Sequence, residues 1–315
     1  MEAEVLDFVR ERAHIGDHVV RGIAAQGMVR AYAVNARRTV QEAHERHGTT
    51  PVVTAALGRL LMCGQMMGAM SKVDDELITL TIRGDGPIGG MTVTANNRGQ
   101  AKGFANRPDV ELPTREDGHL DVGKAVGAGE LLVVFDQPGV APYSSQVELV
   151  SGEIGVDLTN YFALSDQVPS SVGVGVLVDA DGDVRQAGGF IIQLMPGYTD
   201  DVMEALECNL GGVTSVTDLL EGGMSPRDML AHLLRGLDFV ELDAMACEFH
   251  CGCDEGRAAR CVAALGTAEI EEMVEEGETC EVYCHFCGRR HYLTTDDLKA
   301  LLAGEAWDAA PVGRL

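Results

Sequence analysis

Two close pairs of cysteines near the C-terminal end constrain this chain more than any other feature. Cys251-Gly252-Cys253 is followed, after thirty intervening residues, by Cys284-His285-Phe286-Cys287. Each pair can supply two thiolates from one tight turn, and a tetrahedral zinc site needs four, so the intervening segment is expected to fold back and bring the pairs together. A closed set of four thiolates leaves no position open for a substrate. The spacing therefore predicts a structural or switchable metal rather than a catalytic one.

The spacing alone leaves other ligands open. Three further cysteines lie nearby, and two histidines lie beside or inside the motif: Cys247, Cys261, Cys280, His250 and His285. We favour the two pairs because each closes a tight local turn, whereas the other three cysteines lack a partner at ligand spacing. Similar spacing also occurs in zinc ribbons that only stabilise a small domain or bind nucleic acid. A passive structural zinc is therefore the alternative to a switch.

The composition argues against several classes of function. The 315 residues carry a formal net charge of −25, which disfavours a nucleic-acid surface because phosphate binding needs a basic patch. Met1-Glu2-Ala3-Glu4 is acidic and no apolar segment follows it, so no signal peptide is expected. The longest uncharged run, residues 186–199, is shorter than the ~18–20 residues that a membrane helix needs. Nine cysteines without an export signal indicate a reducing cytoplasm and a metal or redox role.

Residues 1–197 are expected to form the main domain, of class α+β on a mainly antiparallel sheet. Residues 4–12 fit a helix or a strand equally well. Thr50-Pro51 predicts the start of a helix, and the apolar residues that follow, up to about Met70, predict that this helix is buried and central. Further expected elements are a helix at 39–47, a helix at 154–165, and strands at 23–34, 77–82, 91–94, 131–135, 172–178 and 184–194. Strands joined by tight turns, with helices grouped apart, are typical of this class.

The composition changes at about residue 198. Residues 200–308 carry 24 acidic against 7 basic side chains. Short helical patterns separated by glycines predict that 198–246 is a metastable helical linker, folded only when docked on a partner. Residues 247–292 are expected to form a small zinc-binding redox-switch domain, and 293–315 a C-terminal helix and tail. A zinc domain of this size, fewer than about fifty residues, is near the limit below which metal or disulfides are needed for folding.

Two motifs that could suggest a ligand are interpreted as turns. Gly84-Asp85-Gly86-Pro87-Ile88-Gly89 fits the glycine pattern of dinucleotide binding, but a strand rather than a helix follows it. In Asp179-Ala180-Asp181-Gly182-Asp183 the glycine stands at the fourth position instead of the sixth that a calcium loop requires. The chain contains no Gly-x-x-x-x-Gly-Lys-Ser/Thr and no Gly-x-Ser-x-Gly motif, so nucleotide hydrolysis and a serine nucleophile elbow are unsupported.

Several stretches together resemble a known family. The strongest is Phe249-His250-Cys251-Gly252-Cys253-Asp254-Glu255-Gly256-Arg257 with Cys284-His285-Phe286-Cys287. Supporting stretches are Gly84-Asp85-Gly86-Pro87, Gly152-Glu153-Ile154, Ser165-Asp166-Gln167-Val168-Pro169 and Ala187-Gly188-Gly189-Phe190. Over nearly its whole length the chain resembles the redox-regulated 33-kDa heat-shock chaperone (33 kDa chaperonin) family of bacteria.

The resemblance implies a cytoplasmic holdase, active without ATP, and not an enzyme. It implies that Cys251, Cys253, Cys284 and Cys287 bind one Zn²⁺ in the reduced state. On oxidation it implies Cys251–Cys253 and Cys284–Cys287 disulfides, loss of zinc, unfolding of the C-terminal part and exposure of a surface for unfolded client proteins. The active form is implied to be a homodimer, with no nucleic acid, nucleotide or membrane as partner.

This chain departs from the family pattern at a few positions. Asp254 stands where a serine is expected, although both can cap a helix. The sequence leaves open the roles of the five remaining cysteines: Cys63, Cys208, Cys247, Cys261 and Cys280. The competing hypothesis is an enzyme or binding module in residues 1–196, with a zinc that only braces the C-terminus.

Overall fold

The structure is a computed structural model that describes residues 16–179 and 181–304. These residues divide into two units, one ending at His250 and the other beginning at Cys251. The first unit contains two sheets with helices packed on them, and most strand pairs in it are antiparallel. The expected α+β class is therefore confirmed. Residues 4–12, for which helix and strand fitted equally well, lie outside the described residues.

The first sheet has five strands in the order β10-β1-β2-β9-β8, all antiparallel to their neighbours. Their bounds are β1 His18–Ala24, β2 Val29–Asn35, β8 Ser170–Val178, β9 Val184–Leu194 and β10 Val240–Ala246. A single strand was expected over 23–34, and this prediction is wrong in part. A 3-10 turn at Ala25–Gly27 divides the segment into β1 and β2, and Gln26 has a φ of 56° there.

The second sheet has six strands in the order β11-β5-β4-β3-β6-β7, and β11 alone runs parallel to its neighbour. Their bounds are β3 Leu77–Gly84, β4 Met91–Asn96, β5 Gln100–Ala105, β6 Gly129–Asp136, β7 Tyr143–Glu148 and β11 Glu248–Phe249. The strands expected at 77–82, 91–94 and 131–135 are confirmed. β5 and β7 were not expected, because Gln100, Lys102, Gly103 and the serines of β7 lack the branched apolar side chains that signal a strand.

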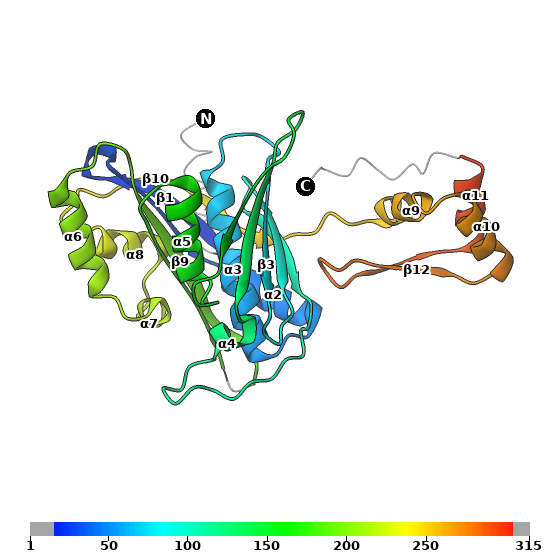
Figure 1. Cartoon of the computed structure of the whole chain (residues 1–315), viewed down its shortest axis with the longest axis horizontal. Helices are drawn as coiled ribbons and strands as arrows, with labels where there is room; N and C mark the ends of the chain where they lie inside the picture. The colour runs from blue at the N-terminus through cyan, green and yellow to red at the C-terminus, as the bar shows by residue number, and fades with distance from the viewer. Residues whose placement is uncertain (1–15, 180, 305–315) are drawn as a thin grey trace. The chain divides into compact units, whose positions relative to one another are not determined.

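Helix α3 (Pro51–Met70) is the central element of the first unit, as expected. It contacts strands β8 and β9 of one sheet and β3, β4 and β5 of the other, and α2 (Arg37–His47) packs beside it (Figure 1). Pro51 is at its start, but the Thr50 hydroxyl donates to the Val110 carbonyl instead of capping the helix. By length and composition α3 could cross a bilayer, although Arg59 interrupts its run of uncharged residues. Its most apolar window is 89% buried inside the unit, as expected of a core helix.

The two glycine- and aspartate-rich motifs are hairpin turns. Gly84 to Gly89 lies between β3 and β4, which are antiparallel neighbours. Asp179 and Asp183 close the turn between β8 and β9, where the Asp179 N–H donates to the Asp183 carbonyl. Helix α4 (Val122–Val126) packs near α3. The helix expected at 154–165 is instead α5 (Gly155–Tyr161) followed by a π-helix at Phe162–Asp166.

Three short helices cover the outer face of the first sheet. They are α6 (Asp200–Gly211), α7 (Val216–Glu221) and α8 (Pro226–Leu233), and Figure 1 shows them grouped beside β1, β9 and β10. Their apolar side chains form one core with alternate residues of β2 and β9: Val202, Leu206, Val216, Leu220, Met229, Leu230, Leu233, Ala31, Ala33, Phe190 and Ile192. Segment 198–246 is thus docked on the sheet of the first unit, and besides helices it contains the sheet strand β10.

The second unit is small. It consists of α9 (Glu255–Ala263), α10 (Thr267–Glu276), a hairpin of β12 (Cys280–Tyr283) and β13 (Arg290–Leu293), and α11 (Thr295–Leu302). Among its described residues, five buried side chains form the core, and a few partly buried apolar side chains pack against them: Ala259, Val262, Ile270, Leu293 and Leu298 are the buried ones. Leu298 belongs to α11, so the expected C-terminal helix packs in the same core as the hairpin and α9.

The packing of the outer helices predicts a large cost for removing a buried side chain. Leu230 in α8 is 0% exposed, so Leu230→Ala is expected to lower the free energy of unfolding of the first unit by about 2–5 kcal/mol. Leu164, which is 64% exposed, is the matched control, and Leu164→Ala should change it by less than about 0.5 kcal/mol. Urea unfolding followed by circular dichroism measures both. Equal costs would show that α8 is not packed on the sheet in solution.

Candidate metal centre

Two tight turns of the second unit present the four predicted cysteines. Cys284 and Cys287 lie in the turn between β12 and β13, where the Cys284 N–H donates to the Arg289 carbonyl at 2.8 Å and the Gly288 N–H to the Cys284 carbonyl at 2.9 Å. Gly288 has a φ of 69°, a left-handed conformation that glycine adopts without strain. The hairpin therefore holds both sulfurs of this pair on one short turn.

The other pair is positioned by the start of α9. Asp254 is the N-cap of this helix, and its carboxylate accepts the Arg257 N–H at 2.6 Å. The aspartate found where a serine was expected therefore does cap the helix. The cap sets the direction of the chain immediately after Cys253, and the Arg289 side chain donates to the Cys253 carbonyl at 3.3 Å from the opposite turn.

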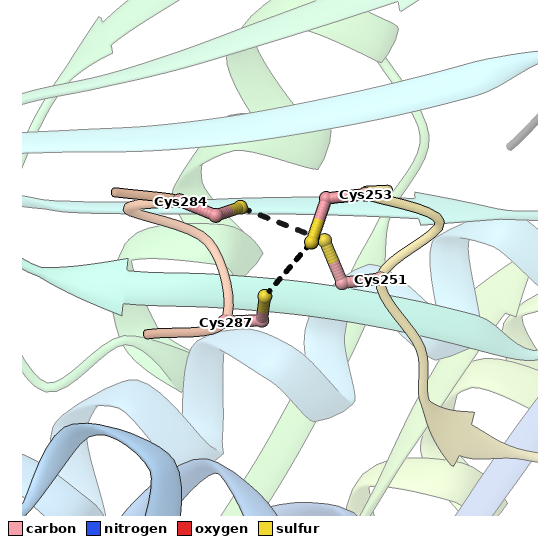
Figure 2. A group of neighbouring side chains, drawn as sticks. All are labelled: Cys251, Cys253, Cys284 and Cys287. Atoms are coloured by element: carbon pink, nitrogen blue, oxygen red, sulfur yellow. Dashed lines mark hydrogen bonds between the residues drawn. The ribbon is translucent and has the colours of Figure 1, made fainter. Parts of the chain in front are cut away.

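The four sulfurs form one cluster (Figure 2). All lie within 4.8 Å of one another, with Cys251 Sγ 3.8 Å from Cys284 Sγ and Cys253 Sγ 3.3 Å from Cys287 Sγ. In a tetrahedral site with metal–sulfur bonds of ~2.3 Å, the sulfurs are about 3.8 Å apart. The cluster therefore fits a tetrahedral metal with four thiolate ligands. In the part of the chain that the structure describes, the nearby Cys247, Cys261 and Cys280 do not belong to this group, and no disulfide joins any of the nine cysteines.

The thiols of the cluster differ in acidity. Burial raises the pKa of Cys253, and so does the hydrogen bond to Cys287. For Cys287, burial also acts to raise the pKa, but hydrogen bonds to its sulfur from the Arg289 N–H and the Cys253 thiol outweigh it, so this pKa is lowered. The hydrogen bond between the two sulfurs thus raises the pKa of Cys253 and lowers that of Cys287. A cation bound among the sulfurs removes the need for such proton sharing, because it stabilises all four as thiolates.

One residue of the site was not predicted. His291 on β13 is 7% exposed, and its Nε2 lies 3.3 Å from Cys253 Sγ. An imidazole N–H that donates to a metal-bound sulfur orients the ligand and spreads its charge. The cysteine spacing could not identify His291, since it stands four residues after the last cysteine. The buried His291 and Leu293 alternate with the exposed Arg290 and Tyr292, and this strand pattern was the available signal.

The cluster predicts that metal binding depends on its four sulfurs and not on the neighbouring thiols. Cys287→Ser removes one of four ligands and is expected to abolish stoichiometric zinc binding. Cys261→Ser is the matched control, because Cys261 is exposed on α9 outside the cluster and should bind zinc like the unmodified protein. Elemental analysis of purified reduced protein measures both. Full zinc content in Cys287→Ser would contradict the ligand set.

Substitution of His291 is expected to weaken zinc binding less than substitution of a cysteine ligand. His291→Phe keeps a ring on β13 but removes the group that bonds to Cys253 Sγ, and it should lower zinc affinity by about 10-fold or more. Tyr292→Phe is the control, since Tyr292 is 55% exposed on the same strand. Competition with a chromogenic chelator gives the affinities. Unchanged affinity in His291→Phe would show that the bond does not support the ligand.

Comparisons with known proteins agree over most of the chain. A family model described as Hsp33 protein matches residues 17–294. The 33 kDa chaperonin of Agathobacter rectalis is 46% identical over 287 residues, which cover 91% of this chain and 100% of that relative. The 33 kDa chaperonin of Bacillus licheniformis is 43% identical over 286 residues, which cover 90% and 98%.

A solved structure shares the fold. The crystal structure of the 33 kDa chaperonin (heat shock protein 33 homolog) of Thermotoga maritima matches with a TM-score of 0.85 and 34% sequence identity. The match covers 93% of this chain and 99% of that one. Sequence and fold thus relate the chain to the same group of proteins.

Proposed function

Because this chain belongs to the Hsp33 family of chaperones, we propose that it is a redox-regulated holdase that captures unfolding proteins without ATP under oxidative stress. The relatives carry the name chaperonin, which denotes a folding assistant, so the expectation that the chain is not an enzyme is confirmed. The observation that carries the redox proposal is the four-sulfur cluster inside a unit with a very small core.

The cluster is proposed to bind one zinc ion through Cys251, Cys253, Cys284 and Cys287 in the reduced protein. Bound Zn²⁺ would keep all four sulfurs in the thiolate form near neutral pH. Cys251, Cys253 and Cys284 are each partly exposed, while Cys287 is 2% exposed. The partly exposed sulfurs are therefore the ones that a small oxidant can reach first.

The proposed oxidation has two steps. A cysteine thiolate attacks one oxygen of hydrogen peroxide, which gives a sulfenic acid and releases hydroxide. A neighbouring thiolate then attacks that sulfur, which forms a disulfide and releases a second hydroxide. We propose the pairs Cys251–Cys253 and Cys284–Cys287, on the basis of the family resemblance. The sulfur–sulfur contacts of 3.8 and 3.3 Å in the structure join Cys251 with Cys284 and Cys253 with Cys287 instead, so peptide mapping of the oxidised protein decides the pairing.

Oxidation is proposed to unfold the second unit. Structural zinc contributes on the order of 10–16 kcal/mol to small sites of this kind. A core of five buried residues cannot replace this contribution, since units of this size depend on metal or disulfides. Disulfides within Cys-x-Cys and Cys-x-x-Cys close very short loops and restrain little of the unfolded chain. The four thiolates are thus proposed to hold the unit folded.

The domain boundaries are proposed from the sequence. We propose 1–197 as the chaperone core, 198–246 as a metastable linker, 247–292 as the redox switch and 293–315 as the C-terminal helix and tail. The linker helices are short and separated by glycines, and Met229, Leu230 and Leu233 are buried against the sheet. Their release would expose the apolar faces of the helices and of the sheet, which suit unfolded clients.

The proposed partners are unfolded client proteins and, in the oxidised state, a second copy of this chain. We propose that the protein acts in the cytoplasm, where thiols stay reduced until oxidant appears. Nucleic acid, nucleotides and membranes are not proposed as partners, because the net charge of −25 repels phosphates and the chain lacks a Gly-x-x-x-x-Gly-Lys-Ser/Thr motif.

The first test follows zinc and client capture together. Zinc-loaded protein is treated with hydrogen peroxide at mildly elevated temperature, while a zinc-sensitive dye follows metal release and light scattering follows aggregation of a heat-unfolded enzyme. We expect zinc release and suppression of aggregation to rise together, and the reduced protein to suppress little. Retained zinc, or zinc loss without any gain in suppression, would contradict the switch.

A second test separates a switch from a brace. Cys284→Ser with Cys287→Ser removes one ligand pair without any oxidant. If zinc only braces the C-terminus, this variant loses stability and gains no activity. If the cluster is a switch, the variant suppresses aggregation under reducing conditions. Cys208→Ser with Cys261→Ser is the control, because both residues are exposed and lie outside the cluster.

A further inference from the structure

One extended segment lies along the edges of both sheets of the first unit. Residues 240–249, which we call the strap, contain β10 and β11. β10 is the edge strand beside β1, and β11 is the edge strand beside β5. From Cys247 to His250, three backbone N–H groups donate to the rest of the first unit: those of Cys247, Glu248 and His250 donate to the carbonyls of Asp17, Gly99 and Ala101 at 2.9, 3.1 and 2.8 Å. The strap therefore completes two sheets at once.

Backbone bonds hold the strap along both edges, and a few polar side-chain contacts add to them. Asp243 accepts a hydrogen bond from Arg21 at 2.5 Å, and Glu248 accepts one from Gln100 at 3.0 Å. Val240 is 53% exposed and Leu242 is 43% exposed, and the register of β10 shifts at Leu242. The buried side chains of the strap are Ala244, Cys247 and Phe249. Backbone pairing does not depend on the side chains of the added strand, so an edge of this kind can accept segments of many sequences.

Two glycines give the strap room. A Cβ at Gly22, in β1, would lie 2.8 Å from the Val240 carbonyl oxygen and 2.4 Å from the Phe239 ring. A Cβ at Gly99, just before β5, would lie 2.1 Å from the Ala246 carbonyl oxygen. Both distances to backbone are shorter than a real Cβ contact allows. Each edge is thus shaped for close approach of a strand backbone.

The strap ends at Phe249, two residues before Cys251. If the second unit unfolds, as proposed above, the chain that follows the strap no longer has a fixed anchor. We propose that the strap then leaves, and that the edges of β1 and β5 bind an extended segment of an unfolding protein by backbone pairing. This inference deepens the proposed function and rests on it.

The nature of the partner follows from what the strap itself is. It is an extended segment that satisfies the edges with its N–H and C=O groups, and an unfolding protein offers the same groups unpaired. Uncovered sheet edges pair readily with other chains, and a covering segment is one way in which proteins prevent this. A sequence-independent edge also suits a chaperone with many clients.

The reactivity of two cysteines outside the proposed zinc cluster shows whether the strap is in place. Cys247 in the strap is 6% exposed, and Cys63 in α3 is 0% exposed. Burial raises the pKa of both thiols, that of Cys63 to about 12, so neither reacts readily with alkylating reagents while covered. Release of the strap exposes Cys247 alone, whereas unfolding of the core exposes both.

The main test releases the strap without oxidising the protein. Gly99→Ala places a methyl group against the strap at a position where φ is 76°. The matched control is Gly139→Ala, where φ is 79° and no atom lies within 4 Å of the added Cβ. Alkylation with N-ethylmaleimide under reducing conditions, followed by peptide mass spectrometry, should show Cys247 modified about tenfold faster in Gly99→Ala than in the control, with Cys63 unmodified and zinc retained.

Client capture is read in the same samples. Gly99→Ala should bind reduced, carboxymethylated α-lactalbumin, a permanently unfolded probe, with its zinc still in place, and Gly139→Ala should not. Gly22→Ala repeats the test at the other edge, so a folding defect in one variant does not decide the outcome. Protection of Cys247 in both folded variants, or its exposure without capture of the probe, would overturn the proposal.

A peptide tests the backbone pairing. A synthetic copy of residues 240–250 should compete with the probe for peroxide-treated protein. The same peptide methylated on the backbone nitrogens of Cys247, Glu248 and His250 cannot donate the three bonds described above. It keeps only the pairing of β10 with β1 and should compete much more weakly. Equal competition by both peptides, or by neither, would overturn edge pairing.

The unmodified protein separates the two proposals. If peroxide releases zinc without capture of the probe, the proposed function fails. If peroxide-treated protein captures the probe while Cys247 stays protected, the proposed function stands and the strap inference alone is wrong.

Discussion

We propose that the bond between a metal and four thiolates is the interaction on which the fold of the second unit depends. The second unit has five buried core residues in short elements, far too few to offset the conformational entropy of its chain. The sulfurs of Cys251, Cys253, Cys284 and Cys287 lie at distances that suit a tetrahedral metal. A coordination bond of this kind is also reversible by oxidation, since an oxidised sulfur ceases to be a ligand. Metal–thiolate coordination would thus both stabilise the second unit and make its stability sensitive to oxidation.

The first unit is built in the opposite way. Helix α3 is buried between two sheets, and this core needs no metal. Its weaker parts lie outside: the short helices α6, α7 and α8 on one sheet face, and the strap along two edges. Both come late in the chain and directly precede Cys251. If the second unit is the switch that we propose, the parts of the first unit that would be released lie next to it in the sequence.

Local patterns in the sequence predicted part of this structure correctly. The cysteine spacing placed four sulfurs together, because each pair needs only one turn. Thr50-Pro51 and the apolar residues after it located α3. β10 was missed although Val240, Leu242 and Ala244 alternate with acidic residues, because the short helical patterns before it led us to expect a helical linker up to residue 246. The roles of His291 and Gly99 depend on residues distant in sequence, Cys253 and Ala246, so no local pattern contains them.

Hydrogen exchange of the reduced protein, with and without zinc, tests the central claim most directly. The account predicts that removal of zinc by a chelator, with all thiols kept reduced, abolishes the protection of amides in α9, α10, β12, β13 and α11. Protection in α3 and in strands β3, β4 and β6 should stay unchanged. If the second unit kept its protected amides after zinc removal, the metal would not be what holds it folded, and the proposed switch would have no physical basis.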